Sequence, residues 1–190
     1  MQVIYYTSFP TSVARIYVAA TAKGIWKISL THKNEKEFLE ELRSRLPAPA
    51  SATADRPAGK SAEKGIVKND AYFKSIKKDI LKYLSGKPVN FTYQIDMKGT
   101  DFQRKVWRAL RGIPYGRILT YKQVAERIGL PKASRAVGGA CGANELPIII
   151  PCHRVIATGG SLGGFGGGLK LKRHLLRLER VKLKRDMTTH

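Results

Sequence analysis

The sequence "IIIPCHRVIA", residues 148–157, sets a cysteine, a histidine and an arginine side by side after an apolar run that ends in Pro151. A buried structural thiol needs no such neighbours, so Cys152 is either an ordinary core residue or a nucleophile. A cysteine nucleophile reacts as the thiolate, and a nearby imidazole is the usual means of lowering its pKa from about 8.5. The segment therefore predicts nucleophilic chemistry at Cys152, with His153 as the candidate base.

The spacing of these residues limits how His153 can act. Adjacent residues on an extended chain point to opposite sides, so direct contact with the thiol needs a sharp turn after Pro151. A bridging water would solve the geometry, and an acid behind the histidine would fix its tautomer. Glu179 is one of five acids from residue 97 onward, and it stands among basic residues. From the residues alone, an intrahelical ion pair is the favoured interpretation of Glu179.

The glycine-rich segment "GGSLGGFGGGLK", residues 159–170, follows the cysteine. It lacks the GK[ST] ending of a phosphate-binding loop, and its spacing does not match GxGxxG at the start of a helix. A better interpretation is the wall of a pocket in which a planar group lies against the backbone, with Phe165 as the stacking surface.

The first half of the chain has the pattern of a small α/β domain over residues 1–97, with an antiparallel sheet. Alternating apolar residues predict strands, and apolar residues at helical spacing predict helices. Residues 47–65 are rich in Pro, Ala, Ser and Gly and predict a flexible loop. The expected elements are strands at 2–8, 14–21, 24–30 and 89–95, and helices at 34–46 and 70–88.

The second half, residues 98–190, has the pattern of short helices. Thr100 with Gln103, and Thr120 with Gln123, form capping boxes at the starts of two of them. A third helix over 132–144 predicts a buried side of small apolar residues and an opposite side of arginine and glycine, which are Ala133, Ala136, Val137, Ala140 and Cys141 against Arg135, Gly138, Gly139 and Gly142. Two short helices joined by a tight turn indicate a helix-turn-helix, and a plain helical hairpin is the alternative.

Charge favours the DNA-binding interpretation. The formal net charge is +21, and from Met97 onward 19 Lys and Arg stand against 5 Asp and Glu. An excess of this size implies a polyanionic partner such as nucleic acid. Two cysteines without a CxxC motif predict neither a disulfide framework nor zinc. Because Arg15 interrupts the apolar start of the chain, we expect no signal peptide, no membrane span and a cytoplasmic protein.

Three stretches carry a family resemblance, namely "GTDFQRKVWRALRGIPYGRILTYKQVAERIG", "PKASRAVGGACGANELPIIIPCHRVI" and "GGLKLKRHLLRLE". Together they resemble the O6-alkylguanine-DNA alkyltransferase family. The resemblance implies a ribonuclease-H-like first domain, a winged-helix-like second domain with the helix-turn-helix, and no cofactor or metal. It further implies a monomeric protein that binds double-stranded DNA through the minor groove. The implied reaction is irreversible transfer of an alkyl group from O6-alkylguanine, and also O4-alkylthymine, to Cys152.

The resemblance also implies a role for each matched residue. Cys152 is the acceptor, His153 and Glu179 keep it a thiolate through water, Asn144 is a hinge, and Tyr121 donates toward guanine O6 and helps to rotate the nucleotide. Arg135 enters the base stack, and the glycine-rich helix face enters the minor groove. The implied pocket residues are Pro147, Val155, Phe165, Gly166 and Gly167, and the implied DNA contacts are Tyr121, Arg135, Ala136, Gly138 and Gly139.

Two departures from the family pattern concern the pocket. Phe165 stands where several relatives have tyrosine, and Gly166 where some have serine, so bulkier O6 adducts are expected to fit. Two other functions remain as alternatives. One is an alkyltransferase-like protein that binds the lesion without chemistry, against which the presence of Cys152 argues. The other is a cysteine hydrolase, which needs an oxyanion hole and a transient acyl intermediate.

Overall fold

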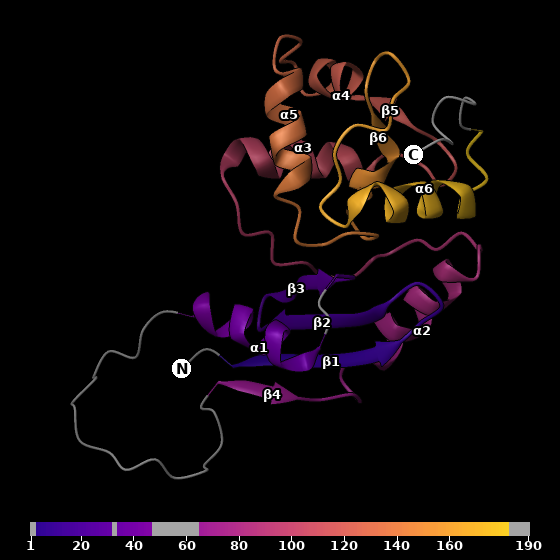
Figure 1. Ribbon diagram of the computed structural model, residues 1–190. Coiled ribbons are helices and arrows are strands. Elements are labelled where there is room, and N and C mark those ends of the chain that lie inside the picture. Colours follow the sequence, from indigo (N-terminus) through magenta and orange to yellow (C-terminus); the bar gives the residue numbers. More distant parts are fainter. Residues whose placement is uncertain (1–2, 32–33, 47–64, 183–190) are drawn as a thin grey trace.

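The computed structural model describes residues 3–31, 34–46 and 65–182, and Figure 1 shows a sheet-bearing half below a helical half. Most of the loop that the sequence predicts, residues 47–64, lies outside the described residues. The elements of the first half are β1 (Ile4–Pro10), β2 (Arg15–Thr21), β3 (Gly24–Ser29), α1 (Glu35–Ser44), β4 (Ile66–Lys68) and α2 (Lys74–Leu84). Those of the second half are α3 (Asp101–Arg111), β5 (Leu119–Thr120), α4 (Tyr121–Arg127), α5 (Ser134–Gly142), a 3₁₀ turn (Cys152–Arg154), β6 (Val155–Ile156) and α6 (Gly168–Leu178).

The sheet of the first half is mixed, which corrects the expected antiparallel sheet. Its strand order is β3-β2-β1-β4, with β2 antiparallel to both neighbours and β4 parallel to β1. Tight turns join the first three strands, whereas β4 follows α1 in the chain and therefore arrives by a crossover, which allows parallel pairing. The sequence shows no strand pattern at β4, because this strand has three residues and two of them are exposed.

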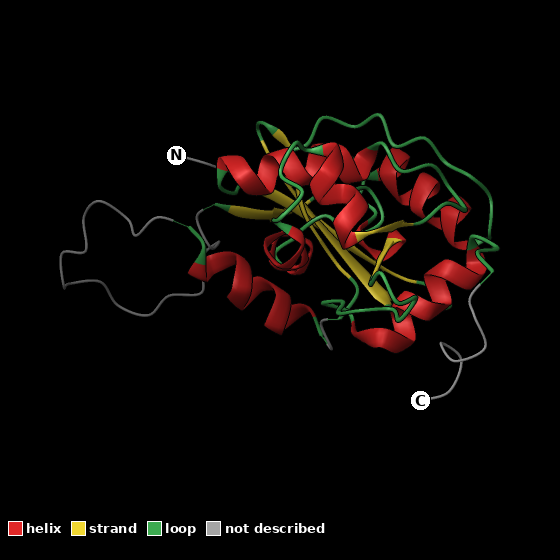
Figure 2. Ribbon diagram, turned by 90° about the horizontal axis from the view of Figure 1, so that it is seen from above, coloured by secondary structure: helices red, strands yellow, loops and turns green. Residues whose placement is uncertain are grey.

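The central strand β2 supports a core on each side of the sheet. Ile16, Val18 and Ala20 lie in a cluster with residues of α2 and of the helical half, whereas Tyr17 and Ala19 lie in a cluster with residues of α1. Successive side chains of a strand point to opposite faces, so one strand contributes to both cores. The helical half therefore shares one continuous core with the sheet, and Figure 2 shows its helices lying over the strands.

The strand expected at residues 89–95 is wrong. This segment is extended and alternates between half-buried and exposed residues, but its only pairing among the described residues is an isolated bridge from Ile95 to Ile25. The side chains of Val89, Phe91 and Tyr93 pack against the core. Alternation therefore reports burial of one side of the chain and does not by itself predict a hydrogen-bonded strand.

The helical half begins its first two helices where the sequence predicts. Both capping boxes form, at Thr100 and Gln103 for α3 and at Thr120 and Gln123 for α4. The helix expected over 132–144 is shorter at each end, because α5 spans Ser134–Gly142. Helices α4 and α5 pack on α3, and the short strands β5 and β6 pair in parallel beside them.

Two hydrogen bonds hold the segments around the site, one between the two halves and one within the helical half. The Ile28 backbone N–H on β3 donates to the Glu145 carbonyl at 2.8 Å, and the Trp107 indole on α3 donates to the Ala140 carbonyl of α5 at 2.8 Å. Glu145, which follows α5 in the chain, therefore contacts the edge strand β3 of the sheet. Within the part of the chain that the structure describes, no helix is long and apolar enough to cross a membrane.

Candidate active site

Cys152 begins the 3₁₀ turn that follows Pro151. The Arg154 N–H donates to the Pro151 carbonyl at 2.9 Å, so the chain turns sharply at the point where the sequence left the geometry open. The preceding residues also turn, with Ile148 in the left-handed region at φ 75° and the Ile150 N–H bonded to the Leu146 carbonyl at 2.8 Å. A β-branched residue at positive φ costs about 1–3 kcal/mol, so the surrounding core holds this segment in place.

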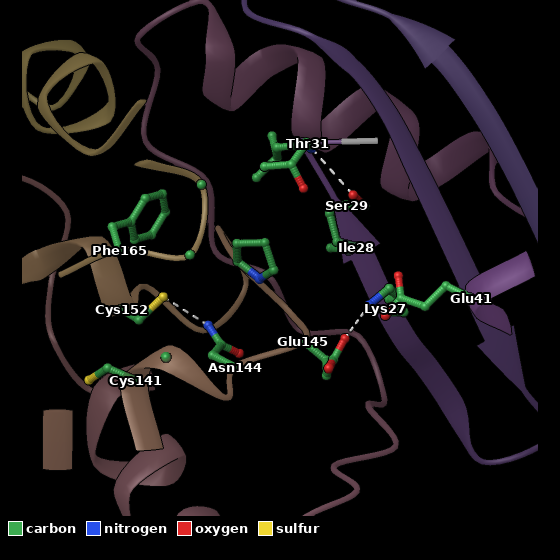
Figure 3. A pocket seen from close by; sticks show the side chains of 15 residues that line it. Lys27, Ile28, Ser29, Thr31, Glu41, Cys141, Asn144, Glu145, Cys152 and Phe165 are labelled. Atoms are coloured by element: carbon green, nitrogen blue, oxygen red, sulfur yellow. Dashed lines mark hydrogen bonds and ion pairs between the residues drawn. The ribbon is translucent and has the colours of Figure 1, made fainter. Parts of the chain in front are cut away.

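The side chain of Cys152 lines a cavity of about 300 Å³ between the sheet edge and the helical half (Figure 3). The thiol-bearing residue is only 5% exposed. Many of the residues predicted for the pocket lie together here. The members of the predicted set that line the cavity are Asn144, Pro147, Cys152, Phe165, Gly166 and Gly167.

Asn144 is the direct hydrogen-bond donor to the thiol. Its side-chain N–H₂ group lies 3.0 Å from Cys152 Sγ and 2.8 Å from the Ile150 carbonyl, while its Oδ1 accepts from the Leu146 N–H at 3.0 Å. With both ends of the amide occupied, the donor is aimed at the sulfur. Burial raises the pKa of the Cys152 thiol, and the Asn144 hydrogen bond and the charge of Lys172 oppose this only in part.

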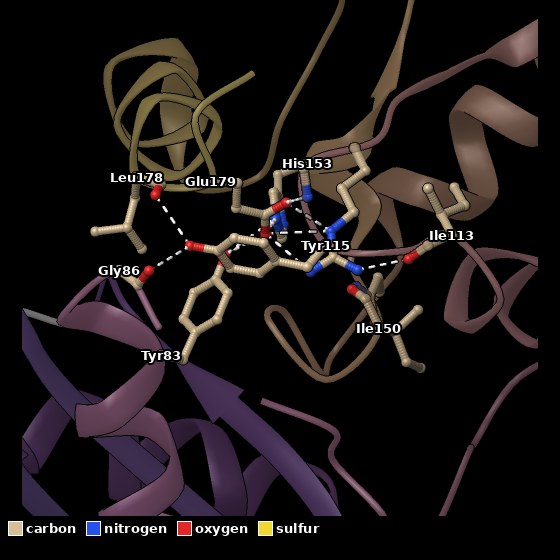
Figure 4. Close-up of polar contacts among 11 residues, drawn as sticks. Tyr83, Gly86, Ile113, Tyr115, Ile150, His153, Leu178 and Glu179 are labelled. Atoms are coloured by element: carbon tan, nitrogen blue, oxygen red, sulfur yellow. Dashed lines mark hydrogen bonds and ion pairs between the residues drawn. The ribbon is translucent and has the colours of Figure 1, made fainter. Parts of the chain in front are cut away.

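His153, the residue after Cys152, forms a buried pair with Glu179 (Figure 4). His153 Nε2 lies 2.8 Å from Glu179 Oε1, and both side chains are fully buried. Burial lowers the pKa of His153 even though Glu179 works in the opposite direction. The other ring nitrogen, Nδ1, is buried without a hydrogen-bond partner among the described residues. Burial disfavours both charged forms, so the resting thiol and imidazole are neutral.

Arg154 completes the surroundings of Glu179 through an ion pair and also contacts a backbone carbonyl. Its Nε and Nη2 donate to the carboxylate at 2.9–3.1 Å, and its Nη1 donates to the Ile113 carbonyl at 2.6 Å. The Gly116 N–H donates to Glu179 Oε2 at 3.0 Å. Burial alone raises the carboxyl pKa, but the hydrogen bonds from His153 and Arg154 outweigh it and lower the pKa of Glu179 to about 2.

Tyr121 and Val155 lie around the glycine segment. The Tyr121 hydroxyl donates to the Gly164 carbonyl at 3.4 Å, and its pKa is raised to about 12, first by burial. A Cβ at Gly163, where φ is +66°, would lie 2.8 Å from the Tyr121 ring, so this position requires glycine. The Val155 carbonyl accepts from Lys172 Nζ at 2.6 Å. A carbonyl has two lone pairs, so this bond leaves one acceptor site.

Helix α5 presents the residues predicted to bind DNA. Arg135, Ala136 and Gly139 are exposed, whereas Gly138 is half-buried beside the Tyr121 ring. The predicted burial of Ala136 is wrong, because only Val137, Ala140 and Cys141 of this helix are buried. Ala133, also predicted on the buried side, is half-buried and precedes the helix, which starts at Ser134. A Cβ at Gly139 would meet no atom within 4 Å, so packing inside the chain does not require glycine there.

Two buried polar residues of the site were not predicted from the sequence. Lys172 is fully buried, and its ammonium also donates to the carbonyls of Leu162 and Gly164. Tyr83, on α2, donates to Glu179 Oε1 at 2.6 Å. Helical spacing could have indicated that both side chains are buried. Lys172 lies three residues before Leu175, and Tyr83 lies three residues after Ile80, on the buried faces of their helices.

Comparison with known families gives two matches that together span most of the chain. The family description "6-O-methylguanine DNA methyltransferase, ribonuclease-like domain" matches residues 4–97, and "6-O-methylguanine DNA methyltransferase, DNA binding domain" matches residues 101–181.

Three proteins with the name methylated-DNA–protein-cysteine methyltransferase are similar to this chain. The protein of Methanosarcina barkeri is 46% identical over 181 residues, which cover 95% of this chain and 100% of that protein. The inducible protein of Bacillus subtilis is 39% identical, over 86% of this chain and 83% of that protein. The protein of Mycobacterium bovis is 49% identical over 106 residues, which are 56% of this chain and 64% of that protein.

The solved structures agree with these matches. The crystal structure of Mycobacterium tuberculosis O6-methylguanine methyltransferase superposes with a TM-score of 0.74 at 30% identity and covers 97% of this chain and 98% of that chain. The structure of Mycobacterium tuberculosis OGT in complex with DNA gives a TM-score of 0.71 at the same identity and coverage. By its sequence and by its fold, the chain belongs to the 6-O-methylguanine DNA methyltransferase family.

Proposed function

We propose that this protein is a methylated-DNA–protein-cysteine methyltransferase that repairs DNA by direct reversal. It takes the alkyl group of O6-alkylguanine, and also of O4-alkylthymine, onto Cys152. The observation that carries the proposal is the position of the Cys152 thiol, which faces a cavity and receives a hydrogen bond from Asn144 while the buried His153–Glu179 pair lies behind it. Family membership supports the same reaction.

The proposed first step makes the thiolate. The proposed acceptor is His153 Nδ1, which has no hydrogen-bond partner among the described residues, because the ionised Glu179 carboxylate can only accept from an N–H at Nε2. A water between Cys152 and His153 passes the thiol proton to Nδ1, and the carboxylate of Glu179 stabilises the imidazolium that results. Asn144 Nδ2 remains bonded to the sulfur and stabilises its negative charge.

The proposed second step is an in-line displacement. The Cys152 sulfur forms a bond to the alkyl carbon while the bond from that carbon to guanine O6 breaks, and its electron pair stays on the oxygen. The hydroxyl of Tyr121 and the N–H of Gly166 donate to this oxygen. Because the pKa of Tyr121 is raised to about 12, its hydroxyl keeps its proton at neutral pH and remains a donor. The thioether is stable, so each molecule acts once and no cofactor is consumed.

The proposed binding mode takes the damaged nucleotide out of the duplex. Flipping costs a few kcal/mol and is offset by stacking and phosphate contacts. Arg135, exposed near the start of α5, fills the gap in the stack, and the surface of Ala136, Gly138 and Gly139 enters the minor groove. The absence of atoms near a Cβ at Gly139 supports close approach of a partner from outside the chain.

The cavity at Cys152 is the proposed binding site for the flipped base. Phe165 supplies the stacking surface, Pro147 and Gly167 line the wall, and the carbonyls of Cys152 and Val155 accept from the guanine amino group. A cavity of about 300 Å³ is of the size that holds a small planar ligand. The Val155 carbonyl already accepts from Lys172, so the guanine uses its second lone pair.

The division into a ribonuclease-like domain at 1–97 and a DNA-binding domain at 98–190 is part of this proposal, supported by the two family matches. We propose that a monomer acts on one lesion in double-stranded DNA. Its substrate makes the nucleoid in the cytoplasm the proposed place of action.

Duplex DNA with a labelled O6-methyl group tests the proposal. Wild type is expected to carry the label on Cys152 after incubation, and Cys152→Ala is expected to carry none. Label that stays on the DNA would indicate a protein that only binds the lesion. An adduct that forms and then disappears would indicate hydrolysis. Either result would overturn the proposed transfer.

A further inference from the structure

Tyr83 links the sheet-bearing half of the chain to the buried pair behind Cys152. It lies on α2 and is fully buried, and its hydroxyl is 2.6 Å from Glu179 Oε1 and 3.2 Å from His153 Nε2 (Figure 4). The other recorded partners of the Glu179 carboxylate are His153, Arg154 and Gly116, all from the helical half. Among the described residues, Tyr83 is therefore the contribution of the sheet-bearing half to this network.

The direction of the Tyr83 hydrogen bond follows from the charges of the two groups. Glu179 is ionised at neutral pH, because its pKa is lowered to about 2, and a carboxylate can only accept. Burial, followed by the nearby charge of Glu179, raises the pKa of Tyr83 well above the ordinary tyrosine value, so the phenol keeps its proton. Tyr83 is thus a permanent donor to Glu179 Oε1.

Because Tyr83 donates to Glu179, both oxygens that lie near His153 Nε2 face it with lone pairs. The proton of Tyr83 points to Glu179, so the tyrosine oxygen meets Nε2 with a lone pair at 3.2 Å, beside the carboxylate oxygen at 2.8 Å. A neutral imidazole with its own lone pair on Nε2 would face both oxygens without a proton between them. The tautomer with the proton on Nε2 satisfies both acceptors and leaves Nδ1 free to accept.

We propose that Tyr83 is a positioning residue for alkyl transfer, which holds His153 as the Nε2–H tautomer so that Nδ1 is the base for the Cys152 thiol. This inference rests on the proposed function. Tyr83 does not line the cavity, and its hydroxyl bonds to Glu179 and lies beside His153, so it acts through these two residues. It also gives the ribonuclease-like half a part in the chemistry of the other half.

Tyr83→Phe is the test, and Tyr115→Phe is the matched control. The Tyr115 hydroxyl donates to the carbonyls of Gly86 and Leu178, each at 3.0 Å, and its ring packs edge-on against Tyr83. Each variant thus removes one hydroxyl that bridges the two halves, but only Tyr83 bonds to Glu179. Thermal unfolding of both variants measures the loss of stability that they share.

Two rates are measured against pH, namely methyl transfer from O6-methylguanine DNA and reaction of Cys152 with iodoacetamide. Mass spectrometry of the peptide that contains Cys152 separates its reaction from that of Cys141. Tyr83→Phe is expected to slow both reactions about tenfold at neutral pH and to move the midpoint of the iodoacetamide profile upward by about one pH unit, the size expected for one hydrogen bond to a charged group. Tyr115→Phe is expected to keep the wild-type midpoint.

Three outcomes would overturn the role of Tyr83. One is a wild-type rate and midpoint in Tyr83→Phe, and another is an equal slowing of both variants with unmoved midpoints. The third comes from wild type alone and applies even if Tyr83→Phe does not fold, namely nitrogen NMR that finds neutral His153 protonated on Nδ1. If wild type takes no alkyl group from DNA, the proposed function fails, while the iodoacetamide profile and the NMR still decide the role of Tyr83.

Discussion

Two buried thiols line the same cavity and differ in their surroundings. Cys141 lies on α5 and Cys152 on the 3₁₀ turn, and both are less than 10% exposed. Burial raises the pKa of each, to about 12 for Cys141. Asn144 donates a hydrogen bond to Cys152, and the His153–Glu179 pair lies behind it. For Cys141 the charge of Lys172 lowers the thiol pKa but does not offset the effect of burial.

Under the proposed function, access to the cavity is not what separates the nucleophilic cysteine from the inert one, because both cysteines line it. A thiolate in a buried place needs donors that are already in position and a base that can take its proton. In the proposed mechanism Asn144 is this donor and His153 is this base, and the turn after Pro151 leaves the Cys152 sulfur toward Asn144. Among the described residues no side chain donates a hydrogen bond to the Cys141 thiol on α5, and we expect that thiol to be inert.

The largest expected effect comes from replacing each cysteine with serine, which tests the comparison of the two thiols. Cys152→Ser is expected to abolish transfer of the methyl group, because a buried hydroxyl is far less nucleophilic than a thiolate. Cys141→Ser is expected to keep the wild-type rate within about threefold, as for a polar exchange without a role in the chemistry. Label transfer from methylated DNA measures both, and transfer that depended on Cys141 would refute the assignment.

Removal of the donor to the sulfur has the next largest expected effect. Asn144→Asp keeps the acceptor for the Leu146 N–H but replaces the Nδ2 donor with a negative charge beside the sulfur. Transfer is expected to slow about 100-fold, since a hydrogen bond to a charged group is worth about 1.5–3 kcal/mol. Asn90→Asp, at an exposed asparagine, makes the same change in net charge and controls for weaker DNA binding. Equal slowing of both variants would count against the thiol role of Asn144.

Glu179→Gln tests the carboxylate that supports His153, the proposed base for Cys152. The variant is also expected to change the stability of the protein in acid. The folded protein holds the pKa of Glu179 near 2, below the ordinary value of 4.5. The stabilisation is therefore complete above about pH 4.5 and is lost as the pH falls toward 2. At neutral pH the variant is expected to lose about 3 kcal/mol of unfolding free energy, because Arg154 keeps a buried charge without its partner.

The same variant is expected to transfer the alkyl group about tenfold more slowly, because the imidazolium loses its carboxylate. Urea unfolding between pH 7 and pH 3 measures its stability, and the variant should show a flatter acid dependence than wild type. Glu126→Gln, on the exposed face of α4, is the control for loss of one carboxylate. A variant whose stability declined below pH 4.5 as steeply as that of wild type would show that Glu179 is not the group responsible.

The smallest expected effect concerns the cavity and not the thiol. Gly166→Ser adds a side chain to the wall of the cavity that Cys152 lines. A Cβ at this position meets no atom within 4 Å, so the variant is expected to fold and to transfer a methyl group normally. Transfer of a benzyl group is expected to fall a few-fold relative to methyl, since the added atoms narrow the cavity. Wild type that failed to transfer benzyl at all would contradict the open pocket.

The sequence predicts the parts of the fold that depend on neighbouring residues. Both capping boxes are local, and the structure contains them at the starts of α3 and α4. The helices expected over 70–88 and 132–144 start later, at Lys74 and Ser134. The parallel pairing of β4 and the unpaired extended segment at 89–95 depend on which distant strand lies alongside, and alternation carries no such information.

The site shows the same limit. The resemblance to a known family points to the residues of the cavity, and the structure brings Asn144, Cys152 and Phe165 together there. Tyr83 and Lys172 were missed because each looks like an ordinary helix residue until its distant partner is known. Tyr83 meets Glu179 across 96 positions of sequence, and Lys172 meets three backbone carbonyls.

The most direct test of the account is a titration of the protein with an excess of duplex DNA that contains O6-methylguanine, followed by intact-mass measurement and peptide mapping. The predicted result is a gain of one methyl group per chain, on Cys152, that persists after the DNA is removed, with one repaired guanine for each molecule of protein. A methyl group on Cys141, or more than one repaired guanine per molecule, would contradict it.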